Sequence, residues 1–459
     1  MQEPLGAAQA GGGLGNAPVE EAMLDWRNAR KSFMSTLFAD AGIQRIPLVL
    51  DAAWILDNGA LALDGWCALP SDQEPLVVRT VRGRIPLRWF PLVRKERPDV
   101  LGYLKQRRST LPCTESPGFV GYVEPGTTDD RERVKLEFRC GRFRRLVTTT
   151  AVTGPVPEEV FHNLLVEAHD LTRRGLSPLV NVMRHTTLAQ PPRSTTAYRA
   201  PRHREGSTVN VVVPVYGSTA YARSLLMSFS HADARWCGLT LVCDDPDIAD
   251  EFVSQVSSWN DAVFHGPVQV LVHDRNAGFS HACNTGWRSA ASEYQLLLNS
   301  DVVAPQIIND VQLLVTLLDK GAAAVAPALL YPDATIQHAG MEMRRSMDFP
   351  DFVLPIHPGK GQPQDQLPRL PFAVPLLSGA AVLTKTASLE QAGGVPVVYG
   401  RGDFEDVLLS RALRRIGDLL VEPRVRWMHT EAASYPRHRD IALTLAKSVF
   451  ATERQGLAL

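Results

Sequence analysis

The sequence predicts an α/β protein: a parallel sheet covered by helices on both faces, preceded by a small, mainly β sandwich domain. Short alternating strands broken by turn residues run over residues 46–153, whereas from residue 207 onward Val- and Leu-rich strands alternate with helical segments. The length agrees with two domains, because 459 residues exceed what one hydrophobic core usually organises.

The composition is that of a soluble globular protein, with 45% hydrophobic and 21% charged residues. The net charge of −1 gives no bulk electrostatic reason to bind nucleic acid or anionic lipid. No apolar stretch is long enough for a transmembrane segment, although peripheral membrane association stays open. The six cysteines lie far apart without a CxxC pair, so we expect reduced thiols in a cytoplasmic protein rather than zinc sites or disulfides.

The first segment of the chain, residues 1–18, is rich in Gly and Ala and lacks the basic and apolar regions of a secretion signal. We expect it to form a disordered tail. Residues 19–45 place Met23, Trp26, Ala29 and Phe33 at three- and four-residue spacing, which predicts an amphipathic helix.

The β-rich accessory domain is indicated by segments such as "VKLEFRC", in which apolar and charged residues alternate. The segment "WILDNGALALDGWCAL" predicts a hairpin with Asn58-Gly59 at its turn. Trp54, Trp66 and Trp89 are of the residue type that stacks on sugar rings, but the balance favours core aromatics. Whether the domain binds acceptor, forms oligomers or docks on a partner enzyme stays open.

The connection between the domains, residues 154–206, is expected to contain a helix and a linker. The helix would open after Pro157 and end at Gly175. The segment "TTLAQPPRSTTAYRAPRHREGST" has no period, so we place the boundary there and assign residues 207–459 to the second domain.

Polar residues follow the predicted parallel strands "TVNVVVPVYG", "LTLVCDD", "VQVLVHDRN" and "YQLLLNSDVV". In such sheets ligands bind beyond the carboxyl ends of the strands. Several carboxylates would meet at this rim and repel each other, and a divalent cation would relieve that repulsion while neutralising phosphate. The pattern therefore favours a nucleotide site with Mn²⁺ or Mg²⁺.

The order and spacing of six motifs over residues 207–436 resemble a family 2 glycosyltransferase with the GT-A fold, including bacterial rhamnosyltransferase-like members. The motifs are "VVVPVYG", "LVCDD", "RNAGFSHACNTGW", "LLLNSDV", "YPDATIQHAG" and "YGRGDFEDVLLSRALRRIG", followed by "WMHTEAAS". The resemblance implies a nucleotide-sugar donor, a glycan or glycolipid acceptor and an inverting transfer.

The resemblance also implies which residues bind the donor nucleotide. Asp244 would hydrogen-bond the base or ribose, although the next residues, Asp245-Pro246, depart from the family pattern. Without the resemblance, this Asp-Pro step would simply start a turn. The other residues expected on the donor side are Pro214, Val215, Tyr216, Asn276, Gly278, Asn299 and Ser300.

The metal ligands implied by the resemblance are Asp301, at the last position of a DXD-like "NSD", and His429. Imidazole is a more natural ligand for Mn²⁺ than for Mg²⁺. Asp406 would be the general base, with Glu405 orienting the acceptor. Two acids in the first turn of a helix also favour the helix dipole without any catalysis, with Asp403 as the N-cap, and that simpler interpretation stays open.

Two features near the predicted site have no chemical role at this stage. His338 and Gly340 in "IQHAG" match a family motif, and we expect a structural turn there. The Pro- and Gly-rich segment 357–371 is placed by analogy as a mobile loop near the acceptor site.

Two other functions compete with the glycosyltransferase. One is a glycan- or nucleotide-binding protein of low turnover, which is disfavoured because Asp301, Asp406 and His429 are all retained. The other is a sugar nucleotidyltransferase, which would need a Gly-rich basic loop where this chain has "PVYGSTAY". The donor sugar, the base, the linkage and the oligomeric state cannot be predicted from the sequence.

Overall fold

A computed structural model describes most of the chain. The described residues are 48–68, 75–82, 85–86, 88–106, 116–124, 133–141, 143–158, 160–161, 171–186, 190–230, 232–398, 402, 404–430 and 441–453. The predicted tail and the predicted helix at residues 19–45 lie outside these ranges, as does most of the helix expected after Pro157.

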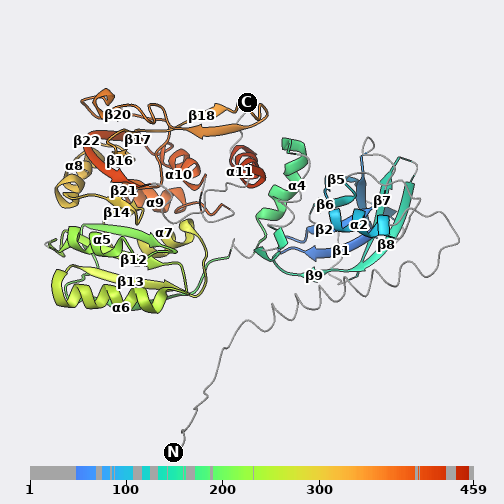
Figure 1. The fold of residues 1–459 in the computed structure, drawn as a ribbon, viewed down its shortest axis with the longest axis horizontal. Helices are drawn as coiled ribbons and strands as arrows, with labels where there is room; N and C mark the ends of the chain where they lie inside the picture. Colours follow the sequence, from blue (N-terminus) through green and yellow to red (C-terminus); the bar gives the residue numbers. More distant parts are fainter. Residues whose placement is uncertain are drawn as a thin grey trace, which may run out of the picture.

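The accessory domain is built on a 9-stranded, mostly antiparallel sheet, seen on the right of Figure 1. Its elements are β1 (Leu48–Ile55), β2 (Leu61–Cys67), β3 (Val77–Arg82), β4 (Ile85–Pro86), β5 (Phe90–Lys95), α2 (Pro98–Gln106), β6 (Gly118–Val123), β7 (Arg133–Cys140), β8 (Phe143–Thr150) and β9 (Val152–Thr153). The predicted Asn58-Gly59 hairpin is confirmed, because β1 pairs antiparallel with β2 and Gly59 has a φ of +75°. The alternating burial predicted for "VKLEFRC" is also observed.

The second domain is built on an 11-stranded sheet, nine strands of which follow the order β10-β13-β12-β11-β14-β21-β16-β22-β15, while β17 pairs with β16 and β20 with β22. Its first half comprises β10 (Ser194–Arg199), β11 (Val209–Val215), α5 (Ala222–Phe229), β12 (Cys237–Cys243), α6 (Ala249–Trp259), β13 (Val268–His273), α7 (Phe279–Arg288), β14 (Tyr294–Leu298), β15 (Val302–Val303) and α8 (Ile307–Asp319). Its second half comprises β16 (Ala324–Leu330), β17 (Ile336–His338), β18 (Glu342–Arg345), β19 (Val353–Ile356), β20 (Phe372–Ala373), β21 (Ala381–Lys385), α9 (Thr386–Ala392), α10 (Glu405–Leu413) and β22 (Leu419–His429).

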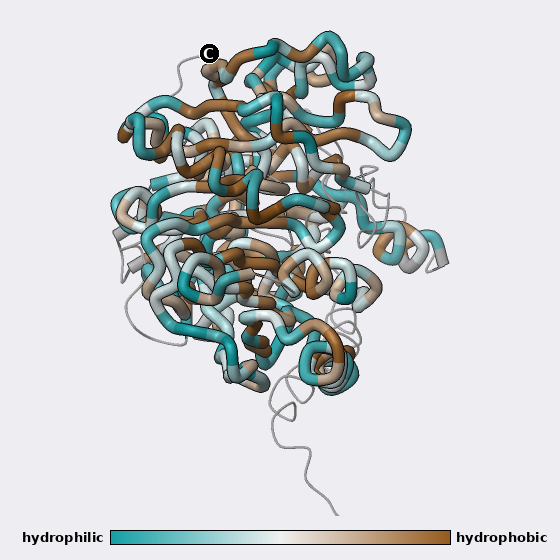
Figure 2. The backbone as a smooth tube through the Cα atoms, turned by 90° about the vertical axis from the view of Figure 1, so that its left-hand side faces the viewer, coloured by the Kyte–Doolittle hydropathy of each residue, from teal (hydrophilic) through white to brown (hydrophobic). Residues whose placement is uncertain are grey.

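The centre of this sheet is parallel and buried on both faces. β13, β12, β11 and β14 run parallel to one another. In β11, Val211 and Val213 pack with α5, α6 and α8, whereas Val212 packs on the other face with α7, α9 and α10. Figure 2 shows the hydrophobic segments gathered in the central layers. This double covering explains why the strands read as continuous apolar runs.

The two domains meet through a pair of helices, α4 (Arg173–Met183) and α11 (Ile441–Glu453), which lie side by side in Figure 1. One apolar core joins Trp54 of the accessory sheet, Leu179 of α4, Val449 of α11 and Leu408 of α10. Arg173 Nη2 donates a hydrogen bond of 3.1 Å to Thr452 Oγ1. The contact between the domains is therefore a packed apolar core.

Two details of the connecting segment differ from the prediction. Gly175 does not end a helix: it lies in the first turn of α4, and its N–H donates to the N-cap side chain of Thr172 at 3.1 Å. The expected linker also contains β10, which pairs antiparallel with β13 and so belongs to the sheet of the second domain. Within the described residues, no helix combines the length and apolarity needed to cross a membrane.

The described cysteines agree with the expectation of reduced thiols. Cys67, Cys140, Cys237, Cys243 and Cys283 are buried, and no two of these described cysteines form a disulfide with each other. Burial raises the pKa of the Cys237 thiol to about 12, so it stays protonated at neutral pH. Cys113 lies outside the described residues.

Candidate active site

The rim at the carboxyl ends of the parallel strands collects the predicted site residues. β11 ends at Val215, β12 at Cys243, β13 at His273 and β14 at Leu298, and each is followed by a polar loop. The end of β22 reaches the same place, because Val302 of β15 pairs with His429 of β22. Residues from distant parts of the sequence therefore meet at one edge.

Asp301 and His429 form a buried pair, although 128 positions separate them. Asp301 Oδ1 lies 3.1 Å from His429 Nε2, and each residue is only 6% exposed. Thr430 Oγ1 lies 3.3 Å from Asp301 Oδ2. Burial raises the pKa of Asp301, but the hydrogen bond and positive charge of His429 outweigh it and bring that pKa below its usual value. The carboxylate is therefore charged at neutral pH.

The geometry of this pair fits a divalent cation. Two neighbouring ligands of an octahedral ion, each about 2.1 Å from it, lie about 3 Å apart. The observed 3.1 Å between Asp301 Oδ1 and His429 Nε2 matches that separation. The described residues contain no group of three or more His, Cys, Asp or Glu suited to a metal. The remaining ligands would therefore have to come from the substrate phosphates and water.

Asp244 is buried at the end of β12, and its carboxylate is held by the protein. Its carboxylate is 3% exposed; Oδ1 lies 2.7 Å from His273 Nδ1 and accepts from Ala277 N at 2.9 Å, while Oδ2 accepts from Gly278 N at 2.6 Å. These bonds fix the loop before α7, and the predicted contact of Asp244 with the nucleotide stays a prediction. Gly278 helps to fix this loop, because its φ of +92° lets its N–H reach the carboxylate.

The neighbouring Asp245 is the acid that faces the rim. It is half-buried; its Oδ2 accepts from Gly217 N at 3.0 Å and its Oδ1 from Asp247 N at 3.2 Å. Asp245 therefore ties the end of β12 to the loop after β11. The sequence alone could not tell which side chain of the Asp-Asp pair turned inward.

The remaining donor-side residues divide by exposure. Pro214 and Tyr216 are partly exposed at the end of β11, whereas Val215 between them is 2% exposed and packs in the core, so its side chain offers little surface to a nucleotide. Asn299 and Ser300 are partly exposed after β14. Asn276 has a buried Nδ2 with no hydrogen-bond partner. A buried donor without a partner costs free energy, so Asn276 is suited to meet a ligand oxygen.

Glu405 and Asp406 open α10 beside a pocket of about 600 Å³. Asp406 Oδ2 accepts from Gly379 N at 3.2 Å, and Oδ1 accepts from Val407 N at 2.8 Å. The residue at the N-cap is Phe404, not Asp403, and its φ of +69° is unusual for a side chain of that size. Strained backbone of this kind often occurs at functional sites.

The same pocket brings both predicted clusters together. The polar side chains that line it are Asn299, Gln337, His357, Lys360, Ser378, Glu405, Asp406, His429 and Thr444. The candidate base and one member of the candidate metal pair, His429, therefore open onto one cavity, and Asp301 lies behind His429 at 3.1 Å.

His357 and Lys360 were not predicted as site residues. His338 Nε2 accepts from Gly340 N at 3.3 Å and from Ser378 N at 3.2 Å, so its proton lies on Nδ1. That proton is donated to His357 Nδ1 at 3.1 Å, which leaves the His357 proton on Nε2. The motif "IQHAG" thus forms the expected turn and also fixes the tautomer of a pocket histidine.

The segment predicted as a mobile loop, 357–371, starts at this pocket with His357 and Lys360. Its mobility is not tested, but its placement beside Asp406 agrees with the expectation. The only sequence signal for these two residues was their presence in that Pro- and Gly-rich stretch.

The tryptophans of the accessory domain follow the simpler interpretation. Trp54 and Trp66 are 6% and 0% exposed, so neither offers a face to a sugar. Trp89 is partly exposed, but the guanidinium of Arg79 lies 4.3 Å from its ring centroid and that of Arg139 lies 5.7 Å away. These three residues therefore belong to the packing of the domain.

Residues 210–380 match the family model described as Glycosyl transferase family 2. No curated protein is detectably similar to the chain in sequence. Among 185 matching solved chains is "Mannosyltransferase PcManGT from Pyrobaculum calidifontis in complex with GDP-Man and Mn2+", which is 17% identical with a TM-score of 0.34. That alignment covers 61% of this chain and 70% of the other.

Proposed function

Because residues 210–380 are a family 2 glycosyltransferase domain with the GT-A fold, we propose that this enzyme moves a sugar from a nucleotide-diphosphate donor to an acceptor hydroxyl. The acceptor would be a glycan or glycolipid, the configuration would be inverted, and Mn²⁺ or Mg²⁺ would be bound. The observation that carries the proposal is the pocket that holds Asp406, Asn299 and His429 together.

Asp406 is proposed as the general base. Its two oxygens are held by backbone N–H groups of Gly379 and Val407, which keeps the carboxylate facing the pocket. It takes the proton of the acceptor hydroxyl; the acceptor oxygen bonds to the anomeric carbon, and the bond to the donor phosphate breaks. The nucleoside diphosphate leaves with that electron pair. Positioned proton transfer of this kind contributes about 10²- to 10⁴-fold to a rate.

Asp301 and His429 are proposed as the protein ligands of the cation, which when bound would neutralise charge on the donor phosphates. Both side chains are buried, so they are held rigidly in position. With one carboxylate and one imidazole, the donor set is better suited to Mn²⁺ than to Mg²⁺.

The donor nucleotide is proposed to lie along the ends of β11 and β14. The surface available there is offered by Pro214, Tyr216, Asp245, Asn299 and Ser300. Asn276 would supply its unpartnered Nδ2 to a donor oxygen, which would satisfy a group that the protein alone leaves without a hydrogen bond. His357 would donate its Nε2–H on the acceptor side of the pocket. A cytoplasmic location would give access to nucleotide sugars.

The test is a screen of nucleotide sugars with Mn²⁺, Mg²⁺ or EDTA, comparing the wild type with Asp406→Asn and Asp301→Ala. We expect metal-dependent release of nucleoside diphosphate from one donor, lost in both variants. Asp247→Asn, an exposed acid on the loop after β12, is the matched control and should keep full activity. Metal-dependent nucleotide binding without turnover for any donor and acceptor would instead favour a binding protein.

A further inference from the structure

The motif "IQHAG" places a buried amide beside the pocket of about 600 Å³ that contains Asp406 and His429, here called the active-site pocket. Gln337 lines this pocket and is 5% exposed. Its Oε1 is buried and has no hydrogen-bond partner in the described part of the chain. Most buried polar groups are hydrogen-bonded, because an unsatisfied one costs free energy. Gln337 is therefore an exception at the site where a substrate would bind.

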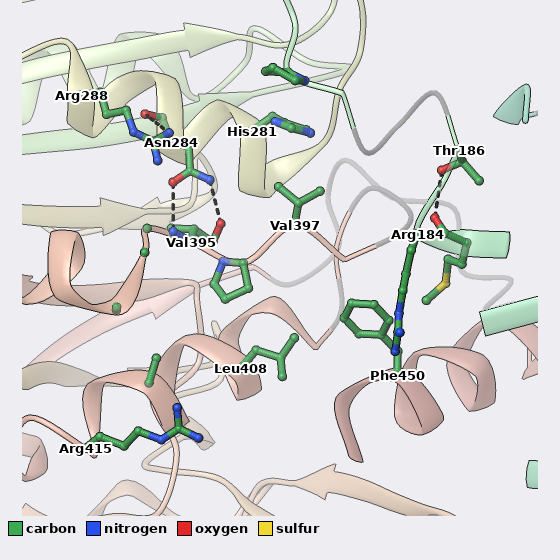
Figure 3. Close-up of a pocket in the computed structure, with 17 residues that line it drawn as sticks. Arg184, Thr186, His281, Asn284, Arg288, Val395, Val397, Leu408, Arg415 and Phe450 are labelled. Atoms are coloured by element: carbon green, nitrogen blue, oxygen red, sulfur yellow. Dashed lines mark hydrogen bonds between the residues drawn. The ribbon is translucent and has the colours of Figure 1, made fainter. Parts of the chain in front are cut away.

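A second buried amide beside a cavity shows the usual arrangement. Asn284 of α7 is 7% exposed and lines another cavity, of about 870 Å³, together with residues of α10 and α11. Figure 3 shows how the protein satisfies this amide: Nδ2 donates to Val395 O at 2.7 Å, and Oδ1 accepts from Val395 N at 2.9 Å. Asn284 thus joins two segments of the fold, whereas the Oε1 of Gln337 joins none.

A β-bulge places Gln337 between two residues that serve the fold. In the pairing of β16 with β17, Leu329 lies opposite His338. The next residue, Leu330, lies opposite Ile336, so Gln337 is the extra residue of the bulge. Ile336 packs in the core, and His338 is 0% exposed. Bulges often re-aim a side chain next to an active site, which agrees with the position of Gln337 in the pocket lining.

Gln337 lies in the deep part of the active-site pocket. Its exposure of 5% is close to the 6% of His429, the candidate cation ligand in the same lining. His357 is partly exposed and Lys360 is exposed, so these two residues lie nearer the solvent. A donor bound through the cation would occupy the deep part first, and the acceptor would approach from the solvent side. Gln337 is therefore placed on the side of the donor sugar.

The sheet sets the distance between Gln337 and the cation ligand. Leu330 of β16 pairs with Ile336 of β17 on one side and with Met428 of β22 on the other. Neighbouring strands lie about 4.8 Å apart, so the backbones of β17 and β22 are roughly 10 Å apart at this point. His429 directly follows Met428. A sugar whose phosphate is bound at His429 therefore lies within reach of Gln337.

The chemistry of the amide suits a sugar hydroxyl. A hydroxyl donates one hydrogen bond, and the unsatisfied group of Gln337 is an acceptor oxygen. The last torsion of a glutamine side chain is broad, so the amide can turn to meet a ligand at little cost. The sugar that is transferred must lie between the cation and Asp406, because the acceptor oxygen attacks its anomeric carbon. Gln337 lines that space.

We propose that Gln337 is a specificity-determining residue whose Oε1 accepts a hydrogen bond from a hydroxyl of the transferred sugar. This rests on the proposed transferase function. A site built to hydrogen-bond a hydroxyl discriminates against an analogue that lacks it, because the buried polar group of the protein then stays unpaired. Gln337 thus selects the donor by its sugar and not by its nucleotide.

The test is Gln337→Met, which keeps the length of the side chain and removes the amide. Calorimetric titration with Mn²⁺ uses UDP-glucose, UDP-galactose, GDP-mannose and dTDP-rhamnose, each beside its nucleoside diphosphate. For the nucleotide sugar that the wild type binds best, we expect Gln337→Met to bind about tenfold more weakly. Binding of the matching nucleoside diphosphate should be unchanged. Gln366→Met, at an exposed glutamine outside the pocket lining, is the matched control and should bind both normally.

A stability measurement separates substrate contact from a structural role. The melting temperature of Gln337→Met should be unchanged or higher, because the replaced Oε1 has no partner to lose. A lower melting temperature together with equal losses for the nucleotide sugar and the nucleoside diphosphate would overturn the proposal.

Deoxy analogues of the preferred nucleotide sugar, each lacking one hydroxyl, identify the group that Gln337 binds. One analogue should bind the wild type about tenfold more weakly and bind Gln337→Met as well as the parent compound does. Equal binding of the parent nucleotide sugar by the wild type and Gln337→Met would overturn this inference and leave the transferase intact. A wild type that binds neither nucleotide sugars nor nucleoside diphosphates would contradict the transferase function itself.

Discussion

Each domain contains a buried contact between an acid and a basic side chain, and the two contacts differ in their surroundings. In the accessory domain, Arg97 is 3% exposed, contacts Asp51 and donates to both oxygens of Asp99 at 2.8 Å. In the second domain, Asp301 and His429 are each 6% exposed. His429 lines a pocket of about 600 Å³, and Asp301 contacts His429. Both are close contacts between an acid and a basic side chain, and only the second adjoins a cavity.

The two contacts differ in the basic side chain, which is Arg97 in one and His429 in the other. Burial lowers the pKa of Arg97, but its hydrogen bonds and the charges of Asp99 and Asp51 outweigh this and raise that pKa above its usual value. Arginine therefore keeps its proton and its partners permanently. An imidazole can release its proton and offer a lone pair to a metal ion. The comparison teaches that a buried acid paired with arginine stabilises the fold. A buried acid paired with histidine can form a metal site, because the imidazole can lose its proton and bind a metal ion.

The largest effect is expected from Asp406→Asn, which removes the proposed base but keeps its shape. Turnover should fall by about 10²- to 10⁴-fold, because an amide cannot take the acceptor proton. The check is steady-state kinetics with the donor found in the nucleotide-sugar screen. Asp99→Asn, at the exposed acid beside Arg97, should keep full turnover, and equal losses in both variants would contradict the contrast between the domains.

Asp301→Asn and Arg97→Gln should separate activity from stability. Asp301→Asn should lower metal-dependent turnover about a hundredfold or more, since a cation supplies several kcal/mol of charge stabilisation. Arg97→Gln should cost about 3–5 kcal/mol in the free energy of unfolding, because it leaves the buried carboxylate of Asp51 without its cation. Urea unfolding and turnover per folded molecule measure the two effects. The contrast fails if Arg97→Gln lowers turnover as much as Asp301→Asn.

His357→Phe should have a smaller effect, about tenfold in kcat/KM, because it removes one hydrogen-bond donor from the acceptor side of the pocket. The loss should appear with the acceptor as the varied substrate and not with the donor. His265→Asn, at an exposed histidine whose φ of +50° suits Asn, serves as the control. An equal loss for both substrates would indicate a merely structural role.

The smallest effect concerns pH and stability. Burial lowers the pKa of His338 well below 6.5, and the positive charges of His357, His429 and Lys360 lower it further. The folded state therefore takes up this proton less readily than the unfolded state, so stability is complete above pH 6.5 and falls as the pH drops below it. The slope from this group is at most about 1.4 kcal/mol per pH unit.

The measurement is urea unfolding of the wild type and His338→Gln between neutral pH and about pH 5. The variant should be less stable at neutral pH and should show a flatter dependence on pH. If stability falls with pH equally in the wild type and in His338→Gln, His338 is not the source of the pH dependence.

The sequence predicted the fold and the two catalytic clusters because those features depend on patterns along the chain. Continuous Val and Leu runs indicated the buried parallel strands, and the order of motifs brought out Asp301, Asp406 and His429. The pocket that Asp406 and His429 share could not be predicted from their spacing, because it depends on how β22 returns beside β15. The metal and base roles themselves stay proposals.

The direction of the Val215 and Asp244 side chains at strand ends was not predicted from the sequence. Val215 follows Val213 by two positions, so the period of the strand already placed it in the core. Asp244 turns inward because His273 and two backbone N–H groups are there to receive it, and these partners come from another strand. Thr172 is a residue type that favours the N-cap of a helix, but Gly175 three positions later was interpreted as the end of a helix. In the structure α4 begins there.

The most direct test of the central claim is electron paramagnetic resonance of Mn²⁺ added to the full chain with a nucleoside diphosphate. The account predicts bound Mn²⁺ in the wild type and in Arg97→Gln, and loss of that signal in Asp301→Asn and in His429→Ala. Undiminished Mn²⁺ binding in both Asp301→Asn and His429→Ala would contradict the claim that this buried pair is the cation site.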